Sequence, residues 1–333
     1  MKYILCIISI VIFSSCQLDN SNTIATITAS TYKIKNISRG NNAPKIDITK
    51  DSLHIFLMAL HAQIPIAEIV HDLQWSEATK RNNINRLLEN KLLIKRGDNY
   101  IPNLCVFTSI KGELLIKKSA LLAQEIADSI VPKLKDIHTL HNKTDISKKY
   151  SFHDLSFFYL SAVLLDNGQI NNIERDFLGK ERPLRNGSRY YLAILEKEEE
   201  NSVEPFGIYG NQVLFRSDSV IVAAYGNTRT QLNKGWQDYQ HKKVHSFSKN
   251  DLHIVSKEMP KTFLATYLKI LNKHKPTFVK IYKELAFEKE TSFEEFFIWY
   301  YHIIYTQTTD LLIKQQLIKK PTNGLFYYEF KMR

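Results

Sequence analysis

The 333-residue sequence predicts an α+β protein in which helices predominate. Apolar residues recur at helical spacing in the first and last thirds of the chain. Between these regions, short apolar runs separated by turn residues predict a small antiparallel sheet. We therefore expect an N-terminal domain of helices and a hairpin, a mixed middle region and a helical C-terminal domain.

Residues 1–15 have the pattern of a secretory signal peptide. Lys2 precedes an apolar run from Tyr3 to Phe13, and two serines stand immediately before Cys16. The run is shorter than the ~20 apolar residues that a membrane-spanning helix needs. The segment resembles a bacterial lipoprotein signal, which implies that Cys16 is lipidated and holds the protein in a membrane. The resemblance implies a place in the bacterial cell envelope, with the outer membrane as the expected site.

Residues 16–50 predict a flexible tether behind that lipid anchor. They are rich in Asn, Ser, Thr and Lys and contain few large apolar side chains. Such a composition buries too little apolar surface to fold by itself. We expect at most a short strand between Ile24 and Ile34.

The next domain, residues 51–141, is predicted to contain helices and a hairpin. The expected helices cover residues 53–60, 66–73 and 76–90, the third with Ser76 as its cap. Strands are expected at residues 92–94 and 100–108, on either side of a Gly97 turn. A long helix over residues 109–141 should bend near Pro132, which cannot donate a helical hydrogen bond.

Two segments of this domain resemble the MarR-type winged helix-turn-helix family. Leu88–Arg96 is similar to the end of the family's recognition helix and its first wing strand, and Phe107–Leu114 to the start of the following helix. The resemblance covers about residues 51–140. Leu92 stands where the family usually has a helix-ending glycine, so another residue must form the turn.

In that family the third helix enters the DNA major groove and the wing contacts the DNA backbone or minor groove. Steps of 100° per residue, with Ile84 and Leu87 facing inward, place Asn82 and Arg86 on the outer face. Lys95 and Arg96, in the segment that resembles the wing, could neutralise DNA phosphates. The predicted macromolecule-binding residues are Thr79, Asn82, Asn83, Arg86, Lys95 and Arg96.

The middle region, residues 151–258, is predicted to begin with a helix. Ser151 and Asp154 have capping-box spacing before an apolar helix that reaches Leu165. A strand is expected over residues 190–195. Residues 212–215 and 219–225 flank a turn and predict a hairpin.

The C-terminal domain, residues 260–333, is predicted to be helical and to end in a hairpin. Helices are expected over residues 262–271 and 277–286, and a third begins after Ser292. The run Leu312–Lys320, a turn and the strand Leu325–Phe330 repeat the order of elements found around Leu88–Arg96. Either a second winged-helix-like unit or a plain helix and hairpin fits this order.

The sequence contains no motif that predicts catalysis. It lacks the Gly-x-Ser-x-Gly elbow, the phosphate-binding lysine loop and the His-Glu-x-x-His zinc motif. Cys105 lies in an apolar run, which favours an inert thiol. The pairs His138/His141 and His241/His245 lack an obvious acidic third ligand. We expect no enzymatic activity, no cofactor and no metal.

The formal charge of +11 favours anionic partners such as nucleic acid, acidic glycans or a membrane surface. Two hypotheses follow. The first is a lipid-anchored, non-catalytic binding or scaffold protein of the envelope, with a protein partner. The alternative is a cytoplasmic, DNA-binding transcriptional regulator whose apparent signal is not used.

Overall fold

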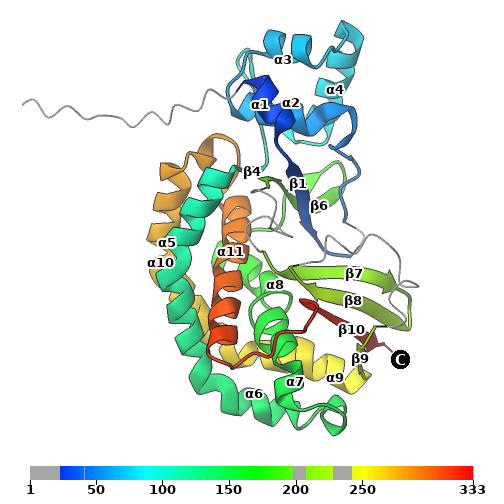
Figure 1. The fold of residues 1–333 in the computed structure, drawn as a ribbon, viewed down its shortest axis with the longest axis vertical. Helices are drawn as coiled ribbons and strands as arrows, with labels where there is room; N and C mark the ends of the chain where they lie inside the picture. Colours follow the sequence, from blue (N-terminus) through cyan, green and yellow to red (C-terminus); the bar gives the residue numbers. More distant parts are fainter. Residues whose placement is uncertain (1–22, 41, 198–207, 228–241, 333) are drawn as a thin grey trace, which may run out of the picture.

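The computed structural model describes residues 23–40, 42–197, 208–227 and 242–332. Helices take up 55% and strands 19%, in small sheets without a barrel, which confirms a mainly helical α+β fold. A helical module that contains α1 to α4 lies at one end of the molecule, and a larger body of helices and strands lies beneath it (Figure 1). Within the described ranges, no helix is both long and apolar enough to cross a membrane.

The N-terminal module has the predicted order of three helices and a hairpin. Its helices are α2 (Leu53–His61), α3 (Ile66–Asp72) and α4 (Glu77–Glu89), and its hairpin is β2 (Leu93–Arg96) and β3 (Asn99–Pro102). Ser76 caps α4 as predicted, because its Oγ accepts the N–H of Thr79 at 3.1 Å. The inward faces of the helices meet around Phe56, Leu87 and Leu92.

The segment expected as a tether is folded where the structure describes it. Residues 23–38 form α1 (Ile24–Ala29) and β1 (Tyr32–Ser38). Ile24 and Ile27 are buried in the core of the N-terminal module, and β1 pairs antiparallel with β6 (Ser188–Glu196). The prediction is wrong here because a few well-spaced isoleucines suffice to bury α1 in a polar stretch.

The predicted strand over residues 100–108 is two strands with different partners. β3 completes the hairpin, whereas β4 (Cys105–Phe107) pairs in parallel with β6. This sheet has the order β1-β6-β4, and the short β5 (Leu184–Arg185) also pairs with β6. The chain therefore passes directly from the hairpin into a central sheet.

The second sheet joins the middle and C-terminal regions. Its order is β7-β8-β10-β9, and its strands are Gly210–Arg216 (β7), Val220–Gly226 (β8), Val244–Phe247 (β9) and Leu325–Lys331 (β10). The predicted hairpin of β7 and β8 is confirmed. β10 pairs with β8 and, in parallel, with β9, so residues 315–324 supply no strand for a C-terminal hairpin. That hairpin, and the second winged-helix-like unit built on it, were wrong predictions.

Helices make up the rest of the body. They are α5 (Ser109–Ile130), α6 (Leu134–His141), α7 (Phe152–Ser156), α8 (Ile170–Ile173), α9 (Lys249–His253), α10 (Met259–Glu284) and α11 (Phe293–Lys314). Short 3-10 or π-helical turns cover Lys50–Ser52, Val131–Lys133, Ile146–Lys148, Phe157–Val163, Glu174–Leu178, Ile254–Glu258 and Phe287–Lys289. The bend near Pro132 and the capping box of Ser151 and Asp154 are confirmed.

The two helices expected on either side of Pro276 form one helix, α10. Leu271 and Phe278 are both buried in the same core, which keeps the helix continuous across the proline. Figure 1 shows α5, α10 and α11 side by side, and ion pairs between Glu125 and both Lys273 and His274 connect α5 to α10. α11 is buried along most of its length and forms the centre of the larger core.

Candidate macromolecule-binding surface

The outer face of α4 and the β2–β3 hairpin carry exposed polar side chains, which we call together the α4–wing surface. Thr79 and Asn82 are exposed on α4, and Lys95 and Arg96 are exposed on β2. These four residues lie where the sequence placed them. The opposite face of α4 is fixed because Ile84 and Leu87 pack into the core of the module.

Asn83, also predicted to bind a partner, is not part of this surface. Its side chain is buried, with 1% of the residue exposed. It lies one turn before the buried Leu87, so it shares the inner face of the helix. Its Oδ1 accepts a hydrogen bond from Arg86 Nη1 at 3.2 Å. A macromolecule therefore cannot reach Asn83 without unfolding the helix.

Arg86 forms an ion pair within the N-terminal module and is not a free cation. Its Nη1 lies 2.5 Å from Oδ2 of Asp51, and the Arg86 side chain is only about one-third exposed. Asp51 adopts a left-handed conformation, with φ of 54°, immediately before α2. The ion pair connects α4 to the segment before α2. It also neutralises the positive charge of Arg86, which was predicted to lie free on the outer face of α4.

The structure adds Arg81 and Asn85 to the α4–wing surface. Both are exposed and lie four residues apart, hence on the same helical face. Across the described part of the chain, Arg81, Lys95 and Arg96 form no ion pair with a carboxylate. Lys80, in contrast, lies 3.4 Å from Glu77. The four-residue spacing of Arg81 and Asn85 indicates a shared helical face. Which residues of α4 are buried must be known before that face can be identified as the exposed one.

The turn between α4 and the wing is made by Lys91, which agrees with the prediction that a residue other than Leu92 forms it. Lys91 has a φ of 52°, the left-handed conformation that glycine adopts most easily. The next residue, Leu92, is completely buried, and its N–H donates to the carbonyl of Leu87 at 2.9 Å. Asn103 Nδ2 donates to the Lys91 carbonyl at 2.8 Å and holds the turn closed.

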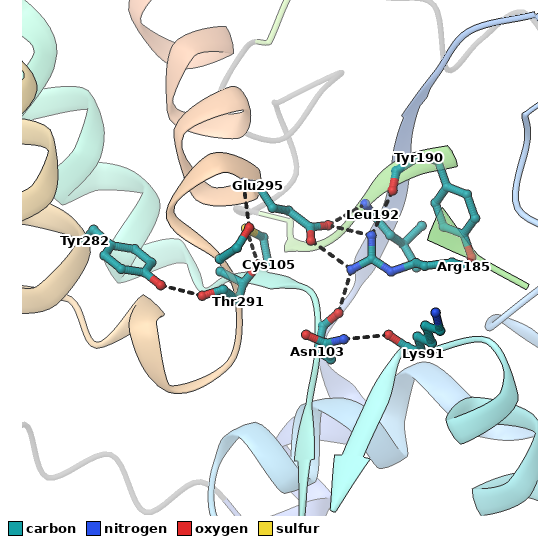
Figure 2. A network of polar contacts seen from close by, with 10 residues as sticks. Lys91, Asn103, Cys105, Arg185, Tyr190, Leu192, Tyr282, Thr291 and Glu295 are labelled. Atoms are coloured by element: carbon teal, nitrogen blue, oxygen red, sulfur yellow. Dashed lines mark hydrogen bonds and ion pairs between the residues drawn. The ribbon is translucent and has the colours of Figure 1, made fainter. Parts of the chain in front are cut away.

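A buried ion pair connects the base of the wing to the body (Figure 2). Arg185 Nη2 donates to the Asn103 carbonyl at 2.7 Å and to Glu295 Oε2 at 2.8 Å. Arg185 Nη1 donates to Glu295 Oε1 at 3.2 Å and to the Tyr190 carbonyl at 2.8 Å. Glu295 Oε1 also accepts the N–H of Leu192 at 2.9 Å. We call Asn103, Arg185 and Glu295 the junction, because they join the hairpin, β6 and the first turn of α11.

Cys105 lies close to the junction and is not placed for nucleophilic chemistry. It is completely buried, and its Sγ donates to Thr291 Oγ1 at 3.9 Å (Figure 2). Burial raises the pKa of the Cys105 thiol well above its usual range, with a smaller contribution from the nearby Glu295 carboxylate. The thiolate, which is the reactive form, is therefore disfavoured.

The histidines considered as metal ligands have other partners. The ring of His138 stacks on Phe152 with centroids 3.7 Å apart, and His141 Nδ1 lies 3.2 Å from the Tyr159 hydroxyl. His245 Nδ1 donates to the Tyr327 carbonyl at 3.1 Å. No cluster of three histidine, cysteine or acidic side chains among the described residues could hold a metal ion. His241 and the predicted lipidation site, Cys16, lie outside the described residues.

Comparison with known proteins gave no relative: no protein-family model matches the chain, and no curated protein or solved structure matches it.

Proposed function

We propose that this protein is a non-catalytic binding protein of the bacterial cell envelope, held in a membrane by a lipid on Cys16. Its α4–wing surface would contact an acidic patch on a protein partner. The observation that carries the binding role is the exposure of Arg81, Asn82, Lys95 and Arg96 on a module with its own apolar core. Lys2, the apolar run and Cys16 support the anchor.

The charge of the α4–wing surface favours an acidic protein over DNA. Arg81, Lys95 and Arg96 are available cations, whereas Arg86 is neutralised by Asp51. Proteins that bind duplex DNA tightly commonly make roughly 6–10 phosphate contacts. Three cations match the smaller demand of an acidic patch on a protein, where charge mainly steers association and fixes specificity.

Site-specific crosslinking in intact cells tests the binding role. A photoreactive amino acid would replace Asn82 or Lys95 in the full chain, and a matched probe would replace Lys148, an exposed lysine in the body. We expect a discrete protein adduct from the first two positions and none from Lys148. Equal adducts from all three positions, or none from Asn82 and Lys95, would contradict the proposed surface.

A DNA-binding regulator is the second candidate. The order of α2, α3, α4, β2 and β3 matches the winged helix-turn-helix resemblance, and the exposed wing cations could contact phosphates. This candidate requires a cytoplasmic protein, because a chain anchored outside the cytoplasmic membrane does not meet the chromosome. A nucleic-acid adduct at Asn82 in the crosslinking experiment would favour it.

A further inference from the structure

An open cavity of about 540 Å³ lies between the end of β1, α8 and the loop that leads into β5. Its volume is in the range of small-molecule sites. Five cationic side chains line it and come from three parts of the chain, namely the turn after β1, the stretch between α8 and β5, and β6: Arg39, Arg175, Lys180, Arg182 and Arg189. We call this cavity the arginine cleft. It is separate from the α4–wing surface and independent of the proposed function.

The choice of cation in the cleft differs from the rest of the chain. The sequence contains 34 lysines and 11 arginines, yet four of the five cations that line the cleft are arginines. Solvation of a surface does not require arginine in place of lysine, so the preference for arginine in the cleft calls for another reason. The planar guanidinium presents paired donors that match the oxygens of phosphate and carboxylate, which a lysine ammonium cannot do.

Arg182 forms a fixed inner wall of the cleft. Only 9% of this residue is exposed. Its Nε and Nη2 donate to the two oxygens of Glu174 at 2.6 and 3.2 Å, and the guanidinium lies over the ring of Tyr191 at 5.9 Å. This bidentate pairing fixes the Arg182 side chain in the wall of the cleft, with its charge balanced by Glu174.

Asn42 connects the backbones of Arg39 and Arg189 at the rim of the cleft. Its Nδ2 donates to the Arg39 carbonyl at 2.8 Å, and its Oδ1 accepts the N–H of Arg189 at 3.0 Å. The amide thereby fixes the backbone of Arg39 beside that of Arg189 at the rim. A local turn at Arg39 and a distant strand, β6, are thus held side by side.

The charges of the cleft leave one guanidinium uncompensated. Glu181 pairs with Arg189 at 3.0 Å, Asp176 with Arg175 at 2.6 Å, and Glu294 with Lys180 at 2.7 Å. Arg39 is exposed and has no carboxylate within ion-pair range among the described residues. The Arg189–Glu181 pair is itself solvent-exposed, so it holds Arg189 only weakly.

We propose that the arginine cleft binds a phosphate-bearing small molecule. Arg39 and Arg189 contact the phosphate oxygens at the rim, Arg189 exchanging Glu181 for the ligand, and the Arg182–Glu174 pair forms the inner wall. A phosphate offers several acceptor oxygens in a compact group, which suits two guanidinium groups that line the same cleft.

Calorimetric titration of the lipid-free full chain, Cys16→Ser, tests this site. The probes are inorganic phosphate, pyrophosphate and citrate at constant ionic strength. We expect saturable one-site binding of pyrophosphate, weakened at least tenfold by Arg39→Ala and by Arg189→Ala. Arg216→Ala removes an exposed arginine on β7 and should leave the affinity unchanged.

Three results would overturn the proposal: no saturable binding of either phosphate probe, equal loss of affinity in Arg216→Ala, or citrate binding as tightly as pyrophosphate. Arg39→Lys keeps the charge but loses the planar donor pair, so we expect an intermediate affinity. Because Arg39 is exposed, its variants should unfold at the same urea concentration as the parent chain, which separates a lost ligand site from a misfolded protein.

Discussion

Arg185 and Glu295 form a bidentate ion pair at 2.8 and 3.2 Å, with 2% and 3% of their side chains exposed. The two residues are 110 positions apart and come from β5 and the first turn of α11. Through the Asn103 carbonyl, the same guanidinium holds the base of the wing. This buried charge pair is therefore one of the contacts that position the α4–wing surface relative to the body, together with the His61–Glu290 pair and the pairing of β1 and β4 with β6.

Glu295→Gln should destabilise the protein strongly. The amide leaves the Arg185 charge buried without a counter-charge, and breaking such a pair typically costs about 3–5 kcal/mol. Urea unfolding followed by circular dichroism measures the change. Lys148→Met, which breaks the exposed pair with Asp145, is the matched control and should be nearly neutral. A loss below about 1 kcal/mol in Glu295→Gln would mean that the pair does not hold the junction.

Lys91→Gly should stabilise the protein. Lys91 adopts a left-handed backbone conformation, which costs a residue with a side chain about 1 kcal/mol more than glycine. We expect the free energy of unfolding to rise by roughly that amount, offset in part by the greater freedom of glycine in the unfolded chain. Lys80→Gly, inside α4, should have the opposite sign. Equal losses in both variants would show that Lys91 does not make the turn.

Protonation of Asp154 in acid should lower the free energy of unfolding. Lys319 Nζ lies 2.8 Å from this carboxylate and Ser151 Oγ 2.7 Å, and these hydrogen bonds hold the pKa of Asp154 well below its usual 3.8. A depressed pKa in the folded state stabilises the protein above the unfolded pKa, and this contribution is lost as the pH falls. The stability difference between the parent and Asp154→Asn should therefore be full at pH 7 and shrink below about pH 4.

Lys319→Met provides the matched test for that pH dependence, because it removes the principal partner of Asp154. In the Lys319→Met background, Asp154→Asn should have a smaller effect at pH 7 and a shallower change in acid. An undiminished effect of Asp154→Asn in that background would assign the stabilisation to another group.

Salt dependence separates the two proposed functions. If the wing binds DNA, Lys95→Ala with Arg96→Ala removes two phosphate contacts, and the slope of log K against log salt should fall by about 2. Arg86→Ala should leave that slope unchanged, since Arg86 is paired with Asp51. For an envelope protein we expect no salt-dependent DNA binding by the lipid-free full chain in filter-binding or anisotropy measurements. Tight, steeply salt-dependent binding would favour the regulator.

Local patterns predicted local structure well. The caps at Ser76, Ser151 and Ser292 and the helical spacing of α2 to α5 were readable because each depends on residues three or four apart. Pairing between distant segments was not readable. Nothing near β10 indicates that it lies between β8 and β9, since its partners are set by tertiary packing.

The candidate surface was predicted only in part, because local patterns identify exposed faces but not contacts between distant residues. Thr79, Asn82, Lys95 and Arg96 lie on exposed faces that periodicity or turn position can identify. Whether the charge of Arg86 is free depends on Asp51, which is 35 residues away, and no local pattern predicts that ion pair. The arginine cleft was not predicted because Arg39 and Asn42 are far in sequence from its other lining residues, which lie within 171–189.

Fatty-acid labelling with membrane fractionation of Cys16→Ser tests the proposed lipid anchor most directly. We expect the parent chain to incorporate a palmitate analogue and to sediment with membranes, and the Cys16→Ser variant to lose both. Cys6→Ala, which changes the other cysteine of the N-terminal segment, should keep both. Unchanged labelling and sedimentation in Cys16→Ser would contradict the anchor and with it the envelope function.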